Sequence, residues 1–174
     1  MADGRQDGRW ALLTAVGVGT QAYGRATDGF DDAVGRRLDL NPTDLRCLDW
    51  LTTRAMSAGE LGEATGLSSP ATTTLLDRLE RKGFVGRHRD TVDRRKVLIE
   101  LTPAGRAQID ELYGPLAVEG SQLLSTFSDD ELVKLGDFLV EATAVVDRHR
   151  ERVLASIESQ QERRDDQLDP AASA

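Results

Sequence analysis

The sequence predicts a mainly α-helical protein with one small β-hairpin. Apolar residues recur every three or four positions along most of the chain, which is the spacing of helices with one buried face. Two short runs, 84–88 and 97–101, flank a polar, charged segment as the two strands of a hairpin do. Helix-capping residues precede the helical runs, at Asn41, Ser57, Ser69, Thr102 and Ser128.

The composition narrows the class of protein. With 174 residues the chain is one domain, or one domain with appended helices. Its mean hydropathy is -0.40, and it has no apolar run near the roughly 18 residues that suggest a membrane span. The single cysteine excludes an internal disulfide and a cysteine-rich zinc site. Because residues 1–10 lack a secretory signal pattern, we expect a cytoplasmic protein without membrane contact.

The first predicted helix spans residues 9–38. Its apolar stripe consists of Tyr23, Ala26, Phe30, Val34 and Leu38. Five glycines lie in the same segment, and each lowers helix propensity by about 1 kcal/mol relative to alanine. We therefore expect a long helix that is bent, or split near residues 17–24, and a loose segment 1–8 before it.

Cap residues predict the next two helices. Asn41 is a favourable N-cap and Pro42 suits the first helical turn, so a helix begins here, with an apolar face of Leu45, Leu48 and Leu51. Ser57 and Glu60 fit the capping-box pattern Ser-x-x-Glu, so a short helix begins there and ends near Ala64. A turn that contains a glycine follows.

A fourth helix is predicted from Ser69 to Lys82. The proline after Ser69 suits a first turn, and Gly83 stands where a left-handed C-terminal cap belongs. The small side chain of Ala64 and the turn at Gly66 permit this helix to cross the preceding one closely. Its apolar face consists of Ala71, Leu75, Leu76 and Leu79.

Two longer helices are predicted for the C-terminal part of the chain. Thr102 and Pro103 begin the first, which we expect Gly114 and Pro115 to kink. A second capping box, residues 128–131, begins the other. We expect four segments: an N-terminal helical region 1–39, a central domain 40–102, C-terminal helices 103–161, and a disordered tail 162–174.

Within residues 40–102, the order of helix, short helix, turn, helix and hairpin is that of a winged helix-turn-helix domain. The last helix of such a unit enters the major groove of DNA, where Ser, Thr and Arg side chains donate to phosphates and base edges. We therefore expect contacts with double-stranded DNA from the outward side of this helix, at Ser68, Ser69, Thr72, Thr73 and Arg78.

The charge distribution favours such a partner, although the whole chain has a net charge of -8. Residues 78–96 hold eight basic and three acidic residues, which is a local net charge of +5. Charges farther away than the Debye length of about 8 Å are largely screened, so this stripe is able to bind phosphate. A solvated surface without a partner would have the same charges, so charge alone leaves both interpretations open.

Two stretches of residues 40–106 carry a family resemblance. Residues 66–74, Gly-Leu-Ser-Ser-Pro-Ala-Thr-Thr-Thr, and 79–85, Leu-Glu-Arg-Lys-Gly-Phe-Val, resemble the recognition-helix region of MarR-type (multiple antibiotic resistance) regulators. Asp93-Arg94, followed by a strand that ends Leu-Thr-x-x-Gly at 101–105, is similar to the wing of that family.

The resemblance implies a homodimeric transcription regulator whose N- and C-terminal helices are dimerisation helices. It also implies a repressor that binds a pseudo-palindromic operator and is released by a small phenolic or lipophilic ligand. By the same resemblance, Arg94 enters the minor groove and Asp93 braces the wing through an ion pair. The other candidate DNA contacts of the wing are Arg89, Arg95 and Lys96.

Several alternatives accompany this hypothesis. Cys47 and Trp50 are candidate residues of an effector pocket, and buried core positions are the alternative for both. His88 and His149 lack partners at metal-ligand spacing, so we expect neither a metal nor a cofactor. Since no nucleophile elbow or similar catalytic arrangement occurs, we expect no enzyme. The rival function is a winged-helix module that binds an acidic protein without DNA readout.

Overall fold

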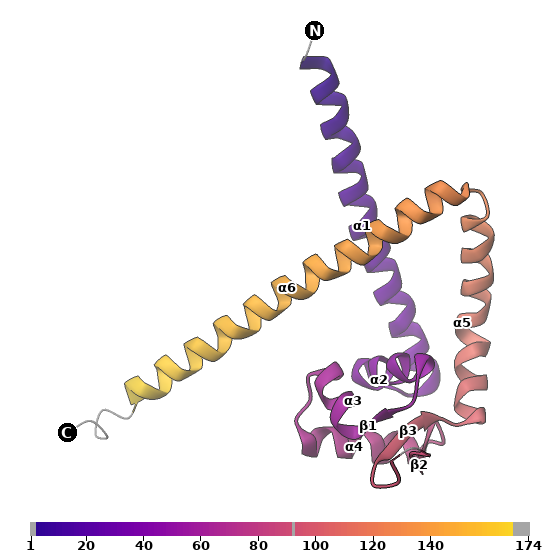
Figure 1. Cartoon of the computed structure of the whole chain (residues 1–174), viewed down its shortest axis with the longest axis vertical. Coiled ribbons are helices and arrows are strands. Elements are labelled where there is room, and N and C mark those ends of the chain that lie inside the picture. The colour runs from indigo at the N-terminus through magenta and orange to yellow at the C-terminus, as the bar shows by residue number, and fades with distance from the viewer. Residues whose placement is uncertain (1–2, 92, 169–174) are drawn as a thin grey trace. The chain divides into compact units, whose positions relative to one another are not determined.

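Six helices and three short strands make up the part of the chain that the computed structural model describes, residues 3–91 and 93–168 (Figure 1). The predicted mainly α-helical fold with a small β-hairpin is confirmed. The first hairpin strand begins one residue later than predicted. In chain order the elements are α1 (Asp3–Leu38), α2 (Pro42–Thr53), β1 (Met56–Ser57), α3 (Ala58–Thr65), α4 (Ser69–Arg81), β2 (Val85–Arg89), β3 (Val97–Leu101), α5 (Pro103–Leu124) and α6 (Asp129–Leu168).

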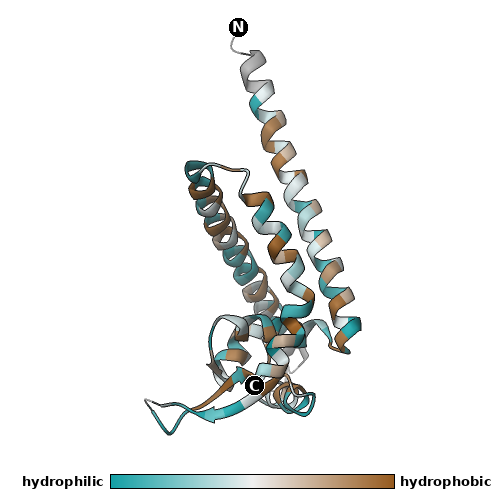
Figure 2. Cartoon of the chain, turned by 90° about the vertical axis from the view of Figure 1, so that its right-hand side faces the viewer, coloured by the Kyte–Doolittle hydropathy of each residue, from teal (hydrophilic) through white to brown (hydrophobic). Residues whose placement is uncertain are grey.

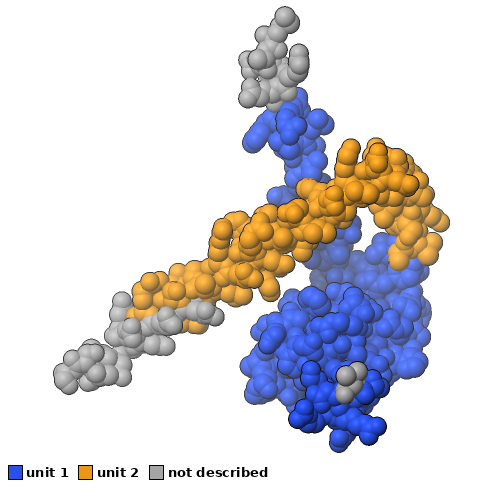
Figure 3. Space-filling view, viewed as in Figure 1, with its two compact units in different colours: residues 1–116 blue, residues 117–174 orange. Residues whose placement is uncertain are grey.

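The chain divides into two compact units, Met1–Leu116 and Ala117–Ala174 (Figure 3). The first unit contains α1, the helix-turn-helix, the sheet and the beginning of α5. The second contains the end of α5 and α6. The predicted C-terminal segment 103–161 is therefore divided between the two units.

The hydrophobic core of the first unit is built mainly from α2, α3, α4 and the sheet. Fourteen buried residues form one cluster, in which Leu61 of α3 and Leu79 of α4 are both 0% exposed. A helix of eight residues is not stable alone in water. Burial of Leu61, worth about 2 kcal/mol, helps to hold α3 in place.

A short strand that the sequence pattern did not indicate completes the sheet. β1 has only two residues, and it pairs antiparallel with β3 through Met56 and Ile99, and through Ser57 and Leu98. The strand order is β1-β3-β2. Because two residues show no alternation of apolar and polar side chains, periodicity does not identify such a strand, and pairing with β3 alone defines it.

α3 and α4 approach each other closely at Gly62, a position that the sequence analysis did not single out, and Ala64 packs against the same core. A Cβ atom on Gly62 would lie 2.9 Å from the hydroxyl oxygen of Thr72. Thr72 therefore takes the buried position on α4 that we expected for Ala71, which is exposed. The hydroxyl of Thr72 donates to the carbonyl oxygen of Ser68 at 3.0 Å, so this buried polar group has a hydrogen-bond partner.

α1 is longer and more regular than predicted. It begins at Asp3, so the expectation that residues 3–8 are loose is wrong, and residues 1–2 lie outside the described residues. It continues through the glycines of segment 17–24, so the predicted split is wrong as well. A helix that has formed gains one hydrogen bond for each added residue, and a few glycines do not interrupt it.

α5 and α6 are both long, continuous helices. α5 is one helix through Gly114 and Pro115, although the proline removes one backbone donor. α6 extends to Leu168, so residues 162–168 are helical where we expected a disordered tail, and residues 169–174 lie outside the described part. This end of α6 is rich in Glu, Gln and Arg, which favour helices even where the apolar stripe is absent.

Candidate nucleic-acid interface

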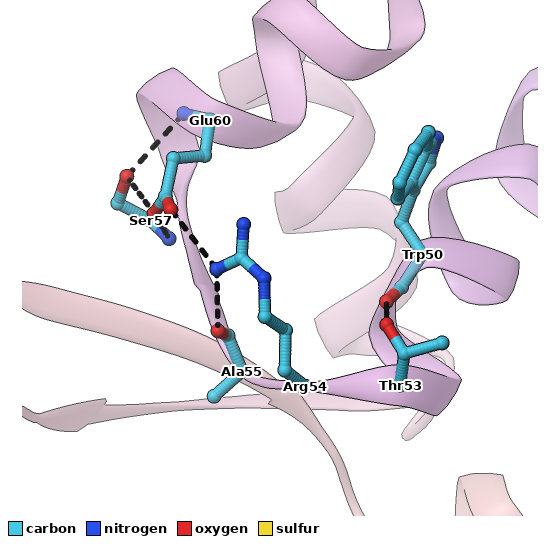
Figure 4. Close-up of polar contacts among 6 residues, drawn as sticks. All are labelled: Trp50, Thr53, Arg54, Ala55, Ser57 and Glu60. Atoms are coloured by element: carbon cyan, nitrogen blue, oxygen red, sulfur yellow. Dashed lines mark hydrogen bonds and ion pairs between the residues drawn. The ribbon is translucent and has the colours of Figure 1, made fainter. Parts of the chain in front are cut away.

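A capping box sets the start of α3, the first helix of the helix-turn-helix (Figure 4). The Glu60 carboxylate accepts hydrogen bonds from the backbone N–H and the hydroxyl of Ser57, at 2.8 and 2.7 Å, and from Arg54 at 2.9 Å. These donors lower the pKa of Glu60 to about 2, because each favours the charged carboxylate. The predicted capping box is confirmed, and the contribution of the charged Glu60 carboxylate to it weakens as the pH falls toward 2.

Gly66 turns the chain from α3 toward α4. Its φ of 72° lies in the left-handed region, which glycine adopts without steric cost. The N–H groups of Gly66 and Leu67 donate to the carbonyl oxygens of Glu63 and Gly62, at 3.3 and 2.9 Å. These bonds satisfy the end of α3 and direct the chain into α4, the geometry of a helix-turn-helix.

The N-terminus of α4 carries exposed hydroxyl groups and lacks a side-chain cap. Ser68 is the N-cap residue, but its side chain makes no capping hydrogen bond. Ser69 and Thr73 are exposed, as predicted, together with Pro70 and Thr74. The N–H groups of an uncapped first turn and the positive end of the helix dipole favour binding of an anion such as a phosphate group.

Two predicted contact residues of α4 are directed toward the protein. Thr72 is 2% exposed, so the expectation that it faces outward is wrong. Arg78 donates through Nη2 to Oδ1 of Asp44 at 2.5 Å, contrary to the outward orientation that we expected. Asp44 is 1% exposed, and its other carboxylate oxygen accepts the backbone N–H of Asn41 at 3.1 Å. Arg78 therefore joins α4 to the start of α2.

Ion pairs reduce the free charge of the basic stripe 78–96. Lys82 pairs with Asp39 at 2.7 Å, and its hydrogen bond lowers the pKa of that carboxyl. Arg87 of β2 pairs with Asp77 and Glu80 of α4, at 2.5 and 2.8 Å. The Arg87 contacts hold the hairpin beside α4. Arg78, Lys82 and Arg87 thus each join two elements of the domain rather than remain free for a partner.

Asp93 organises the tip of the hairpin. Its Oδ1 accepts the backbone N–H of Arg95 at 3.1 Å and the Nε of Arg95 at 3.3 Å, so the ion pair expected of Asp93 forms with Arg95. The Asp93 carbonyl oxygen accepts the N–H of Lys96 at 2.8 Å, and Arg89 donates to the carbonyl oxygen of Arg94 at 3.4 Å. The Arg94 side chain is exposed, and no residue in 3–91 or 93–168 pairs with its guanidinium.

Thr102 and Gly105 anchor the base of the hairpin to α5. The Thr102 hydroxyl donates to the carbonyl oxygen of Gly83 at 2.6 Å, and the same oxygen accepts the N–H of Gly105 at 2.9 Å. A Cβ atom on Gly105 would lie 2.7 Å from the Cα of Phe84 and closer still to the carbonyl oxygen of that residue. The Thr-x-x-Gly motif is therefore a packing requirement at the point where α5 meets β2.

A cavity of about 1540 Å³ is lined by residues of α1, α2, α4 and α5, all within the first unit. α4 contributes Arg78 and Lys82 to its wall. Tyr113 of α5, which also lines the cavity, donates to Asp31 of α1 at 2.7 Å and packs edge-on against the Phe30 ring. Sequence reasoning missed this polar link, since residues 82 positions apart carry no local pattern.

The predicted pocket residues Cys47 and Trp50 do not line this cavity. Cys47 is 1% exposed in the core, and burial raises the pKa of its thiol to about 12, so the thiol stays protonated at neutral pH. Trp50 lies on α2 with 44% of its surface exposed, so it is not the core residue that we gave as the alternative (Figure 4).

Residues 3–91 and 93–168 contain neither a cluster of metal ligands nor a helix that could span a membrane. No three His, Cys, Asp or Glu residues of these ranges are grouped so as to hold a metal ion. None of their helices combines the length and the apolar character that crossing a bilayer requires.

Known proteins are similar to this chain over the helix-turn-helix and the hairpin. The model of the MarR family matches residues 40–97, from the start of α2 into the hairpin. The uncharacterised HTH-type transcriptional regulator YcgE of Bacillus subtilis (strain 168) is 37% identical over 131 residues, which cover 75% of this chain and 85% of YcgE. The HTH-type transcriptional repressor YetL of the same strain is 36% identical over 76 residues, which cover 44% of this chain and 46% of YetL.

Solved structures share the fold. A mutant form of MepR from a multidrug-resistant S. aureus clinical isolate matches with a TM-score of 0.59 and 19% identity, over 72% of this chain and 93% of MepR. The YusO protein of Bacillus subtilis matches with a TM-score of 0.51 and 21% identity, over 76% of this chain and 94% of YusO.

The curated relatives are transcriptional regulators, so the prediction of a regulator rather than an enzyme is confirmed. The family model and the YcgE match together confirm the resemblance on which that prediction rested. The chain belongs to the MarR family, a family of transcriptional regulators with a DNA-binding winged helix.

Proposed function

We propose that this protein is a sequence-specific repressor that binds a pseudo-palindromic operator as a homodimer. One arrangement carries the DNA contact. The uncapped N-terminus of α4 exposes Ser68, Ser69 and Thr73. Through its C-terminal half, at Asp77, the same helix is tied by Arg87 to a hairpin whose Arg94 has no partner in 3–91 or 93–168. A helix N-terminus rich in hydroxyls suits the major groove, and an exposed arginine suits a narrow minor groove.

The remaining wing residues suit phosphate contacts. Arg89, Arg95 and Lys96 surround the tip on an exposed hairpin, and phosphate contacts set the position of a protein on the duplex without selecting its sequence. A regulator of this kind acts on the chromosome, so we place it in the cytoplasm. The name of the relative YetL as a repressor supports repression over activation.

Arg94→Ala tests the DNA contact of the wing. We expect it to weaken binding by about 1–3 kcal/mol and to relax the preference for A·T pairs at the outer edges of the site. Lys96→Ala, the matched variant for a phosphate contact, should weaken all sequences equally and reduce the salt slope by about one unit. Gel-shift titration against the intergenic DNA upstream of the gene measures both.

Unchanged affinity of Arg94→Ala would show that the wing does not read the DNA sequence through this arginine. The module that binds an acidic protein partner would then be the better explanation of the hairpin. Circular dichroism is the control for folding, because exposed hairpin-tip substitutions change stability by only about 0.5 kcal/mol.

Apolar residues recur along the long helices (Figure 2). Many of them are exposed, which supports the homodimer. Tyr23 is 75% exposed on α1, and α6 carries further exposed apolar residues from Val133 to Ile157. Monomers seldom expose apolar patches larger than a few hundred Å². The large exposed apolar residues of α1 are Trp10, Leu12, Leu13, Val16, Val18 and Tyr23.

Light scattering at micromolar concentration is expected to return twice the chain mass of 19.0 kDa. A closed dimer presents two identical α4 helices, so footprinting should protect two half-sites about one helical turn, roughly 34 Å, apart. A monomeric mass, or protection of a single half-site, contradicts the dimer.

The cavity between α1, α2, α4 and α5 is the candidate effector site. Its lining contains seven aspartates and four basic residues, and Arg78 and Lys82 already pair with Asp44 and Asp39. This excess of acidic groups disfavours an anionic ligand. On the family resemblance we propose a phenolic or lipophilic effector, and the lining requires that it carry no negative charge. A ligand that binds the DNA-free protein more tightly than the DNA-bound protein weakens DNA binding. The factor by which the ligand lowers the affinity for DNA equals the factor by which DNA lowers the affinity for the ligand.

A melting-temperature screen of small phenols, with their carboxylated analogues as matched controls, tests the effector site. We expect an uncharged phenol to raise the melting temperature and to release DNA in a gel shift, and its carboxylate analogue to do neither. Stabilisation by the carboxylates alone would contradict the proposed charge preference. An absence of any binder would argue against this form of regulation.

A further inference from the structure

The exposed N-terminal half of α4 has an unusual chemical character for a helix that contacts bases. From Ser68 to Leu76 the sequence contains no Arg, Lys, Asn, Gln, Asp or Glu. The long polar side chains that follow are already engaged: Asp77 accepts from Arg87 at 2.5 Å, and Arg78 donates to Asp44 at 2.5 Å. What this half exposes is small, with methyl or methylene groups on Pro70, Ala71, Thr73 and Thr74.

Hydrogen bonds within the helix restrict the threonines further. The Thr73 hydroxyl donates to the carbonyl oxygen of Ser69, and the Thr74 hydroxyl to that of Pro70, both at 3.0 Å. Each hydroxyl hydrogen is therefore used, and the groups that remain for a partner are a γ-methyl group and oxygen lone pairs. Such side chains are suited to apolar contact and to accepting a hydrogen bond.

Only one of the four bases presents an apolar group in the major groove, the C5-methyl group of thymine. Guanine is recognised mainly by Arg or Lys, adenine by Asn or Gln, and cytosine by Asp or Glu, and this half of α4 lacks all six. We propose that Thr73 and Thr74 are specificity-determining residues that recognise thymine methyl groups in each half-site. This inference rests on the proposed function and names the base chemistry of the same site.

Uracil substitution tests the inference directly, because deoxyuridine pairs as thymidine does and lacks only the methyl group. The full-length protein is first used to select its binding sequence from random duplexes. Each thymine of the half-sites is then replaced by uracil, and thymines outside the footprint serve as controls. We expect a loss of affinity of about fourfold for each contacted methyl group, the ratio for burial of one such group, and no change at the controls.

Matched variants assign the contact to the two threonines. Thr73→Ser and Thr74→Ser remove the methyl and keep the hydroxyl, and Thr73→Val and Thr74→Val keep a methyl and remove the hydroxyl. The serine variants should bind thymine and uracil sites equally at the contacted position, while the valine variants should keep the difference. If the two methyl groups are in contact, the loss of binding free energy from the serine variant and the loss from the uracil site do not add in the combination of the two.

Two results would overturn the inference and leave the proposed DNA binding intact. One is equal affinity for thymine and uracil half-sites. The other is a uracil effect that the serine variants leave unchanged. Failure to select any sequence would overturn the proposed function together with the inference, so the two failures are distinguishable.

Discussion

Asp44→Asn is expected to lower the free energy of unfolding by about 3 kcal/mol. The Asp44 carboxylate is 1% exposed, and both of its oxygens accept hydrogen bonds, one from Arg78 and one from the N–H of Asn41. The amide of asparagine has one acceptor oxygen, and its NH2 group would face one of these donors. This loss of unfolding free energy lies at the lower end of the range measured when one partner of a buried ion pair is removed, because the Arg78 side chain is 34% exposed.

Urea unfolding at a fixed chain concentration measures this loss. Asp39→Asn is the matched control, since it neutralises an aspartate that pairs with another cation of the same region, Lys82. The Asp39 side chain is 98% exposed, and asparagine tolerates its φ of 55°, so the unfolding midpoint should not change. If both variants unfold at the same urea concentration, burial of Asp44 does not matter to the fold.

Gly105→Ala is expected to destabilise the protein by about 3 kcal/mol. The added Cβ would lie 2.7 Å from the Cα of Phe84 and still closer to its carbonyl oxygen. Both are backbone atoms of the residue before β2, so relief of the clash requires α5 to move away from the hairpin. That movement would also disturb the hydrogen bonds of Thr102 to Gly83 and Phe84.

Gly59→Ala is the control for the general effect of replacing a helical glycine. Its Cβ would meet only the hydroxyl oxygen of Ser57, at 4.0 Å, so the substitution should be neutral or stabilise by up to about 1 kcal/mol. Thermal and urea unfolding of the two variants are compared at equal chain concentration, because stability and association are linked. A Gly105→Ala protein as stable as the wild type would show that α5 and β2 need no such close approach.

The sequence by itself determined the order of the elements and the residues where most of them begin. The predicted N-cap at Asn41, the capping box at Ser57, the turn at Gly66 and the left-handed cap at Gly83 are all observed. Each depends on a hydrogen bond or a backbone conformation that involves residues within five positions of one another. Local interactions of this kind can be predicted from the sequence alone. Together with the motif at 93–105 they also indicated the family.

Only the tertiary structure decided which side chains of the basic stripe and of α4 are free to contact a partner. Thr72 was predicted to face outward and is buried against Gly62, while Arg78 and Arg87 are engaged by carboxylates of α2 and α4. The residue that engages Arg78, Asp44, lies 34 positions away. Sequence shows that a charged side chain exists, but its availability depends on which opposite charge the packing of other elements brings within hydrogen-bond distance.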